Sequence, residues 1–312
     1  MNSVSNFSTI SIIIPSHRNE FLEKAVNSVL NQTFPKDYYE IIVVKDYMNE
    51  YLDNFLKSNS IKSFYINDVG FFPKVKVGIE NSKGEVLCFL DDDDEFISSK
   101  LFYVDDIFSK RRELVYLHNN FTPVDKRNEK VKFRNADYNF NCSCISIRRQ
   151  ILKLENIKNI VAMLDLFYFL SAIESGGEIY ITNKKLTKYR VHDSVTNSIN
   201  SEFEEIKKQR LNFFGKASES LIFFKNNFKN KKALKIITAV ETQIYINMYF
   251  LNFAQLYSIN LRNYLIYAPR PFRKRFKVSV GLVIARLFQV LGFDLRENVI
   301  KRQISSNYKY KK

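Results

Sequence analysis

Cysteine, histidine and glycine are all scarce in this chain of 312 residues, and each scarcity excludes a class of site. There are three cysteines, three histidines and eight glycines. Cys88, Cys142 and Cys144 are an odd number without a CxxC pair, and the histidines add no zinc-ligand spacing, so we interpret the cysteines as buried thiols. No glycine-rich loop follows the first predicted strand, which argues against a nucleotidyltransferase that cradles phosphates in such a loop.

The chain also lacks the apolar segments that mark secretory signals and membrane spans. Residues 1–9 are uncharged and mostly polar, so we expect no secretory signal and place the chain in the cytoplasm. Two later stretches, 236–251 and 278–293, are apolar but short, and they are interrupted by Glu241 and Arg286. Neither stretch is predicted to span a membrane.

The formal net charge of +15 is confined to one part of the chain. Residues 1–200 hold 26 basic and 26 acidic residues, so the whole excess lies in residues 201–312. No nucleic-acid-binding module accompanies this excess, so nucleic acid is not the partner that we expect. A neutral first part and a basic second part indicate two different tasks. With 46% hydrophobic residues, the chain is expected to fold around a substantial core.

The most concentrated feature is GEVLCFLDDDDE, residues 84–95, in which an apolar run of strand length leads into five acids. Folding alone does not require such a cluster, because like charges raise one another's pKa values unless a cation is present. On an extended backbone Asp91 and Asp93 would point to one side and Asp92 to the other. Two oxygen ligands on one side suit Mg²⁺ or Mn²⁺. Acidic clusters are also common in solvated loops, and the acids alone favour that alternative.

The first hundred residues alternate between predicted strands and helices. Strands are predicted over residues 9–15, 40–44, 62–66 and 84–90, and helical spacing is found over 20–30, 53–56 and 73–81. Such units pair their strands in parallel through right-handed crossovers. Because ligands bind at the carboxyl ends of such strands, we expect His17 and Arg18, Asp46, and Asp91–Asp94 to converge.

Several motifs in this region resemble those of the family 2 glycosyltransferases of the GT-A fold. The family pattern is a strand ending near S-Y-N, a helix containing S-V-L-x-Q-T-F, a strand E-I-I-V-V-D-D, and an A-x-G-E strand ending in D-x-D-D. The matching segments are Ser16–Arg18, Ser28–Phe34, Glu40–Asp46 and Gly84–Asp94. These motifs occur in register over about ninety residues, which reverses the preference and favours a metal site over a solvated loop.

A looser resemblance continues to about Asn197. Residues 141–149 match the strands that precede the acceptor side of such enzymes. Residues 163–170 match the family's E-D-x-x-x-x-x-R segment, and residues 188–192 match its Y-R-x-H ending. The resemblance therefore covers roughly the first two thirds of the chain.

The chain departs from the family pattern at several positions. Lys45 replaces the first Asp of the D-D pair, and Tyr-Met at 47–48 replaces the Gly-Ser that follows this pair in the family. Leu164 replaces the Glu that precedes Asp165 in the E-D segment. The donor pocket is therefore expected to be atypical. Where the family often has A-R-N, this chain has Lys74 and Lys76, which we interpret as solvated helix lysines, with contact to phosphate as the alternative.

The resemblance implies a role for each residue at the predicted donor site. Asp93 and Asp91 would hold a divalent cation, Mn²⁺ or Mg²⁺, which neutralises the departing diphosphate. Asp93 would be the more direct ligand, while Asp91 or Asp92 would lie nearer the ribose. Ser16 and His17 would contact the nucleotide, and His17 stands where the family usually has a tyrosine beside the base.

Four residues keep two interpretations each. Asp46 would accept a hydrogen bond from the base, or it is a turn acid after its strand. Asp165 would be the general base that deprotonates the acceptor hydroxyl, or the N-cap of a helix over residues 166–173. His192 would reach the metal or the diphosphate, or it is structural. Asp94 either supports the metal ligands or is only a loop acid.

Beyond residue 200 the apolar residues recur at helical spacing, which predicts a helical appendage. Residues 270–277, RPFRKRFK, are cationic with interleaved phenylalanines, and residues 309–312 add more positive charge. We interpret residues 270–293 as a segment that contacts an anionic membrane surface. The alternatives are a solvated basic face and a helix packed against the catalytic domain or against a second subunit in an oligomer.

The sequence therefore predicts an α/β protein of the GT-A (Rossmann-like) fold, with a mixed, mainly parallel sheet flanked by helices. Residues 1–200 would form the catalytic domain, with nucleotide-sugar binding in 1–110 and the acceptor side in 111–200, and residues 201–312 a basic, mainly helical region.

The resemblance implies inverting transfer from a UDP-, GDP- or dTDP-sugar to a hydroxyl of a glycan or lipid-linked acceptor. It would serve cell-surface glycan or glycolipid synthesis, on the inner face of the cell membrane. The alternative is a catalytically silent scaffold of the same fold that binds a partner or a membrane through its basic region.

Overall fold

The computed structural model describes residues 8–68, 70–131, 141–191, 203–251, 261–268, 272–290 and 296. Contacts between residues gather the chain into two compact units. The first comprises Met1–Lys130 and Phe140–Val191, and the second Val131–Asn139 and His192–Lys312. The predicted domain boundary at residue 200 falls outside the described residues.

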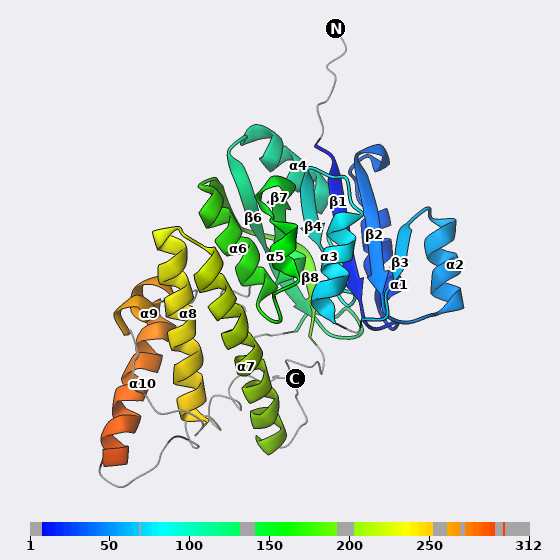
Figure 1. Cartoon of the computed structure of the whole chain (residues 1–312). Coiled ribbons are helices and arrows are strands. Elements are labelled where there is room, and N and C mark those ends of the chain that lie inside the picture. The colour runs from blue at the N-terminus through cyan, green and yellow to red at the C-terminus, as the bar shows by residue number, and fades with distance from the viewer. Residues whose placement is uncertain are drawn as a thin grey trace. The chain divides into compact units, whose positions relative to one another are not determined.

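An eight-stranded mixed sheet forms the centre of the first unit (Figure 1). Its strands are β1 Ile10–Ser16, β2 Tyr39–Lys45, β3 Lys62–Tyr65, β4 Val86–Phe89, β5 Glu95–Phe96, β6 Leu114–Val124, β7 Ile145–Arg148 and β8 Glu178–Arg190. The order across the sheet is β3-β2-β1-β4-β7-β6-β8-β5. β1 is parallel to β2 and β4, β2 to β3, and β6 to β8, whereas β7 is antiparallel to both neighbours and β5 is antiparallel to β8. The predicted mixed, mainly parallel sheet is confirmed.

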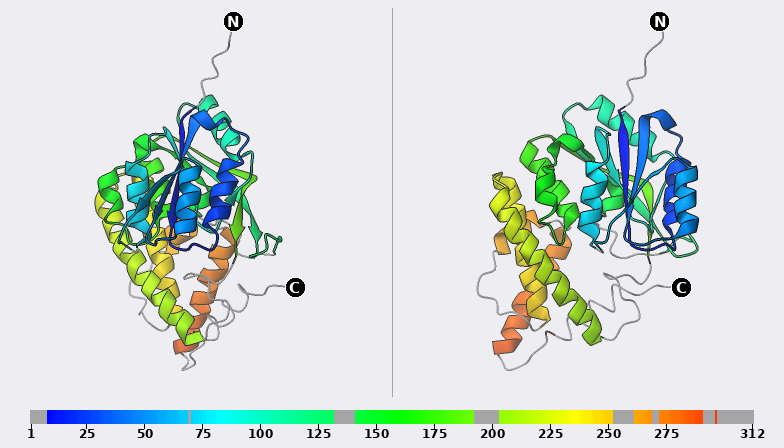
Figure 2. Two further views of the ribbon diagram at one scale, coloured as in Figure 1. Left: turned by 90° about the vertical axis from the view of Figure 1, so that its right-hand side faces the viewer. Right: turned by 45° about the vertical axis from the view of Figure 1, so that its right-hand side comes forward.

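Helices cover both faces of this sheet, as the right-hand view of Figure 2 shows. They are α1 Leu22–Leu30, α2 Glu50–Ser58, α3 Phe71–Glu80, α4 Lys100–Lys110, α5 Leu154–Ile157 and α6 Leu164–Ser175, with single 3₁₀ turns at η1 Lys36–Tyr38, η2 Cys142–Cys144 and η3 Arg149–Ile151. Ile12 of β1 belongs to a core cluster with residues of α1, α2 and α4, whereas Ile13 lies under Gly78 of α3. β1 and β4 are buried along their whole length because helices pack on both sides.

Gly84 allows the chain to pass close to β1 before β4 begins. Its N–H donates to Ser11 Oγ at 2.7 Å, and a Cβ atom at this position would collide with the backbone nitrogen of Ser11. Gly84 is therefore needed for the close approach of the two backbones.

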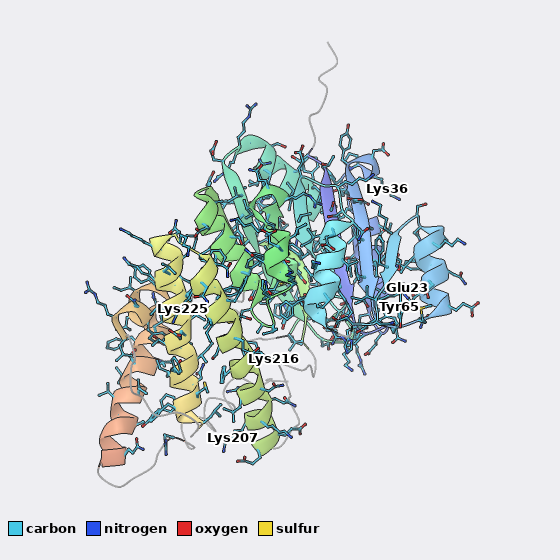
Figure 3. The ribbon with its side chains drawn as sticks, viewed as in Figure 1. Glu23, Lys36, Tyr65, Lys207, Lys216 and Lys225 are labelled. Carbon is cyan, nitrogen blue, oxygen red and sulfur yellow. The ribbon has the colours of Figure 1, made fainter. Side chains whose placement is uncertain are left out.

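The second unit is helical over its described residues, as predicted. Its helices are α7 Phe203–Asn227, α8 Lys231–Phe250, α9 Leu261–Tyr267 and α10 Phe272–Val290. α8 contacts both α7 and α9, and α9 contacts α10. Figure 3 labels three lysines along α7: Lys207, Lys216 and Lys225. Lys225 pairs with Glu241 of α8 at 2.6 Å, which accounts for the acid that interrupts the apolar stretch 236–251.

Candidate active site

The polar segments that follow β1, β2 and β4 meet at one edge of the sheet. β1, β2 and β4 run parallel, so their carboxyl ends lie together, at the lower edge of the sheet in Figure 1. Asp92 accepts a hydrogen bond from the backbone N–H of His17 at 2.8 Å, and Asp46 accepts one from His17 Nδ1 at 2.8 Å. The predicted convergence of these segments is confirmed.

The acids after β4 form a tight turn. The Asp94 N–H donates to the Asp91 carbonyl at 3.1 Å. One carboxylate oxygen from each of Asp91, Asp93 and Asp94 lies within 4.8 Å of the other two. Asp91 and Asp93 thus share one side as expected, but the extended backbone assumed for them is wrong. The chain turns at Asp92 and Asp93, and this turn adds Asp94 to the group as a third carboxylate.

Burial makes this group of carboxylates unfavourable without a counter-charge. Burial, followed by repulsion from the three neighbouring aspartates, raises the pKa of Asp91 well above its usual value. Burial and the charge of Asp93 raise the pKa of Asp94 to about 7. Asp91 Oδ1 is buried and has no hydrogen-bond partner among the described residues. A divalent cation would supply that partner and offset the repulsion, so the three carboxylates fit Mg²⁺ or Mn²⁺.

Asp92 points away from this group and fastens the acidic turn to the end of β1. It is 4% exposed and accepts hydrogen bonds from the backbone N–H groups of His17 and Arg18 at 2.8 and 2.9 Å. Arg18 Nη2 donates to Asp92 at 2.8 Å and to Asp93 at 2.5 Å. No separate role for Arg18 was predicted from the sequence, although its guanidinium contacts Asp93, one of the predicted metal ligands.

Asp46 is held between His17 and a buried lysine. Lys74 Nζ lies 2.7 Å from Asp46, and both side chains are nearly inaccessible. Burial alone would raise the pKa of Asp46, but hydrogen bonds from Lys74 and His17 outweigh it and lower the pKa. The prediction of a solvated Lys74 is therefore wrong. Lys74 lies four residues before Gly78 on the buried face of α3, and this spacing was the available signal.

The two departures from the family pattern beside Asp46 form one local structure. Lys45 is buried, pairs with Asp53 at 2.7 Å and donates to the Tyr47 carbonyl at 2.8 Å. The Tyr47 hydroxyl lies 2.7 Å from Ser16 Oγ and donates to the Arg18 carbonyl at 3.0 Å. The substituted residues therefore tie the end of β2 to the end of β1.

Arg190 of β8 donates further hydrogen bonds to the acidic turn. Its backbone N–H donates to Asp94 at 2.9 Å, and its Nε donates to the Asp93 carbonyl at 2.8 Å. Its Nη2 pairs with Glu95 at 2.6 Å, and Lys188 also pairs with Glu95 at 3.0 Å. Glu95 is therefore part of a buried ion-pair network that holds the turn in place.

The turn at η2 supports the acids from the direction of β7. Ser143 Oγ accepts a hydrogen bond from the Asp91 N–H at 3.0 Å, and Asn141 Nδ2 donates to Asp94 at 3.3 Å. Lys100, fully buried in α4, donates to the Ser143 carbonyl at 2.6 Å. Burial lowers the pKa of Lys100 to about 8. No sequence motif indicated this lysine, because its burial depends on packing against distant strands.

Asp165 lies in the first turn of α6. The helix begins at Leu164 after Met163, which adopts a left-handed conformation with φ 63°, so the predicted N-cap role for Asp165 is wrong. Its carboxylate accepts a hydrogen bond from the Leu166 N–H at 2.9 Å. Burial raises the pKa of Asp165 to about 6, which is suitable for a group that accepts a proton near neutral pH.

The Cys142 thiol lies near both Asp165 and Asp91 of the acidic turn. Burial raises the pKa of the Cys142 thiol well above its usual value, and the charges of Asp91 and Asp165 raise it further. Both carboxylates therefore lie within electrostatic reach of one thiol. His192, the remaining predicted metal ligand, lies outside the described residues, and its role stays a prediction.

A family model described as glycosyl transferase family 2 matches residues 11–167, about half of the chain. The chain belongs to glycosyl transferase family 2. The matched residues include the acidic turn and Asp165.

Curated relatives in this family match different shares of the chain. The putative teichuronic acid biosynthesis glycosyltransferase TuaG of Bacillus subtilis is 27% identical over 212 residues, which are 62% of this chain and 81% of that protein. The GalNAc(5)-diNAcBac-PP-undecaprenol beta-1,3-glucosyltransferase of Campylobacter jejuni is 35% identical over 100 residues, 30% of this chain and 32% of that protein. An uncharacterized glycosyltransferase of Rickettsia bellii is matched over 19% of its length.

A solved glycosyltransferase shares the fold. The structure of S. aureus TarS 1-349 in complex with UDP-GlcNAc superposes with a TM-score of 0.50 at 14% identity, and the match covers 78% of this chain and 86% of that one. At this identity the likeness concerns the fold alone, and it confirms the predicted GT-A architecture of the family member described here.

Proposed function

We propose that this family 2 protein transfers a sugar from a nucleotide diphosphate to an acceptor hydroxyl, with inversion at the anomeric carbon. One observation carries the proposal. Asp91, Asp93 and Asp94 gather three carboxylate oxygens within 4.8 Å, and Asp91 also has a buried carboxylate oxygen, Oδ1, without a partner among the described residues. This arrangement suits a cation that binds a diphosphate at the carboxyl ends of parallel strands.

Each residue has a part in the proposed reaction. Asp93, Asp91 and Asp94 would hold Mn²⁺ or Mg²⁺, which would supply positive charge for the departing diphosphate. Asp165 takes the proton from the acceptor hydroxyl as that oxygen attacks the anomeric carbon and the bond to the diphosphate breaks. His17 contacts the nucleobase of the donor.

The nucleotide would lie across the ends of β1 and β2. Asp46 is kept charged by Lys74 and His17, so it can accept a hydrogen bond from a base N–H group. Uracil, thymine and guanine offer such a group on the ring, which agrees with a UDP-, dTDP- or GDP-sugar. Ser16 Oγ donates to Asp92 at 3.2 Å, and these two residues would lie beside the ribose.

The acceptor is proposed from the names of two relatives. One is a putative teichuronic acid biosynthesis enzyme, and another is named for transfer to an undecaprenol-linked glycan. A glycan or lipid-linked acceptor in cell-surface glycan synthesis agrees with both names.

A screen of nucleotide sugars tests the proposed function. UDP-, GDP- and dTDP-sugars are added with Mn²⁺, with Mg²⁺ or with EDTA, and thermal unfolding and hydrolysis are measured. We expect one nucleotide class to stabilise the protein with the metal and not with EDTA, by about 2.7 kcal/mol when the ligand is present at a hundred times its Kd. A catalytically silent scaffold would show no metal-dependent stabilisation by any member of the panel.

The proposed membrane contact involves the exposed face of α10. In the described part of the chain, no helix has the length and hydropathy needed to cross a bilayer. Phe276, Val280, Val283 and Ile284 recur at helical spacing and are 54, 39, 51 and 45% exposed. Exposed Lys277 lies beside them, and the sequence of α10 begins FRKRFK. An apolar face with neighbouring cations suits the interface of an anionic membrane. Of the predicted segment 270–293, residues 270–271 and 291–293 lie outside the described residues.

Flotation with vesicles tests this contact. We expect the protein to float with phosphatidylglycerol-containing vesicles at low salt and not with phosphatidylcholine alone. Val283→Asp should weaken binding about tenfold or more, because it removes apolar contact and adds repulsion. Ile222→Asp is the matched control, since Ile222 of α7 is 59% exposed and the charge change is the same. Equal loss in both variants, or no flotation of the unaltered protein, would argue against the α10 face.

A further inference from the structure

Two aromatic rings join the strand that precedes the acidic turn to the helix that carries Asp165. The rings of Phe89 in β4 and Tyr168 in α6 are stacked, with centroids 4.4 Å apart and planes at 17°. Phe89 is 2% exposed and Tyr168 is fully buried. The contact is therefore a fixed part of the core between this strand and this helix.

Each ring lies close in the chain to one of the proposed reacting groups. Phe89 is two residues before Asp91, and the Leu90 N–H still pairs with the Ile13 carbonyl at 3.0 Å, so the backbone between them stays in the sheet. Tyr168 is three residues after Asp165 and thus shares its face of α6. This ring contact therefore relates the position of Asp165 to that of Asp91, in addition to the packing of α6 on β6, β8 and η3.

The other described contacts of these groups are local or missing. The Asp165 carboxylate accepts a hydrogen bond from the next residue's backbone N–H, which orients the side chain within α6 but does not fix α6 against β4. The Tyr168 hydroxyl is buried without a hydrogen-bond partner among the described residues. The contribution of Tyr168 to the site is therefore made through its ring.

We propose that the stack of Tyr168 on Phe89 is a positioning element that sets the Asp165 carboxylate at its working distance from the Asp91 metal site. The inference rests on the proposed function, because it assigns Asp165 and Asp91 to one reaction. Neither ring contacts the reacting atoms in this view. They act through the placement of α6 against β4, and a displacement of about 1 Å in such a placement can lower a rate about 100-fold.

The test uses Tyr168→Leu, which removes the stack, and Tyr168→Phe, which keeps the ring and removes the hydroxyl. Transfer of the sugar to water is measured with the nucleotide sugar found in the screen, and binding of the nucleoside diphosphate with Mn²⁺ is measured by calorimetry. We expect Tyr168→Leu to lower kcat about 100-fold with diphosphate Kd unchanged within about twofold, and Tyr168→Phe to keep kcat within about threefold. Leu170→Ala is the stability control, since Leu170 is equally buried in α6; it should lower Tm and leave kcat near that of the unaltered protein.

A double-mutant cycle separates positioning from general destabilisation. Phe89→Leu alone should lower kcat about as much as Tyr168→Leu, and the double variant should lose no more than either single variant, because both remove one contact. Additive losses, a parallel loss of diphosphate binding, or an equal loss in Tyr168→Phe would overturn the inference. If the unaltered protein binds no nucleoside diphosphate with metal, the proposed function fails instead, so the two failures can be told apart.

Discussion

Replacing Asp93 with alanine is expected to lower metal-dependent turnover of the nucleotide sugar by about 1,000-fold, because it removes one of three carboxylates that would hold the cation. Arg18 keeps its hydrogen bond to Asp92 at 2.8 Å, so the loop after β1 should stay in place. The measurement is hydrolysis of the donor with Mn²⁺, together with calorimetry of nucleoside diphosphate binding with and without the metal.

A second property distinguishes Asp93 from an ordinary structural acid. The neighbouring aspartates raise the pKa of Asp91, and Asp93 raises that of Asp94, so removal of Asp93 relieves repulsion in the metal-free protein. We expect the metal-free Tm of Asp93→Ala to be no lower than that of the unaltered protein. Asp106→Ala is the matched control, since Asp106 is a partly exposed acid of α4 that pairs with Lys110. Full metal-dependent turnover in Asp93→Ala would exclude Asp93 as a ligand.

Replacing Asp165 with alanine is expected to abolish transfer while leaving metal-dependent nucleotide binding unchanged. The general base acts on the acceptor, and the nucleotide is held by other residues, so kcat should fall about 1,000-fold or more with Kd for the diphosphate kept. Asp165→Asn serves as the isosteric variant and excludes an effect of lost volume. Retained transfer in both variants would remove Asp165 from the mechanism.

The pH dependence of transfer gives an independent test of the same residue. Burial raises the pKa of Asp165 to about 6, so its carboxylate is charged above that pH and protonated below it. A base must be unprotonated, and kcat at saturating metal should therefore fall as the pH decreases through about 6. The raised pKa also lowers the free energy of unfolding at pH values above the usual pKa of an aspartate, because burial disfavours the charged form. Asp165→Asn should for this reason be no less stable than the unaltered protein at pH 7.5.

The sequence was sufficient to predict the first four strands of the sheet and the convergence of the polar segments that follow them. Strand-length apolar runs and helical spacing placed the first four strands, and parallel pairing then required His17, Asp46 and the acidic turn to converge. These features depend on local pattern and on the rules of chain connection, which a single sequence contains.

The contacts that the sequence did not predict are those of buried cations. Lys74, Lys100 and Arg190 are buried and contact Asp46, the Ser143 carbonyl and the acidic turn, respectively. Lysine and arginine are usually exposed, so the default interpretation is a solvated side chain unless the packing of distant elements is known. The turn at Asp92 and Asp93 was also missed, because four consecutive aspartates have no pattern that fixes backbone shape.

The hydrogen bonds that Arg190 donates to the acidic turn have a consequence for folding. Arg190 and Asp94 are 96 positions apart, and the hydrogen bonds from the β1 loop to Asp92 span 74 to 76 positions. Contacts of such sequence separation form late, since the intervening chain must first be ordered. A nascent chain that has emerged only as far as the acidic turn would carry the aspartates of the turn and the β1 loop, but not Asn141, Ser143 and Arg190, which also hold the turn. Tight metal binding should therefore begin when β8 docks. The cation affinity would then measure whether the first unit has folded completely.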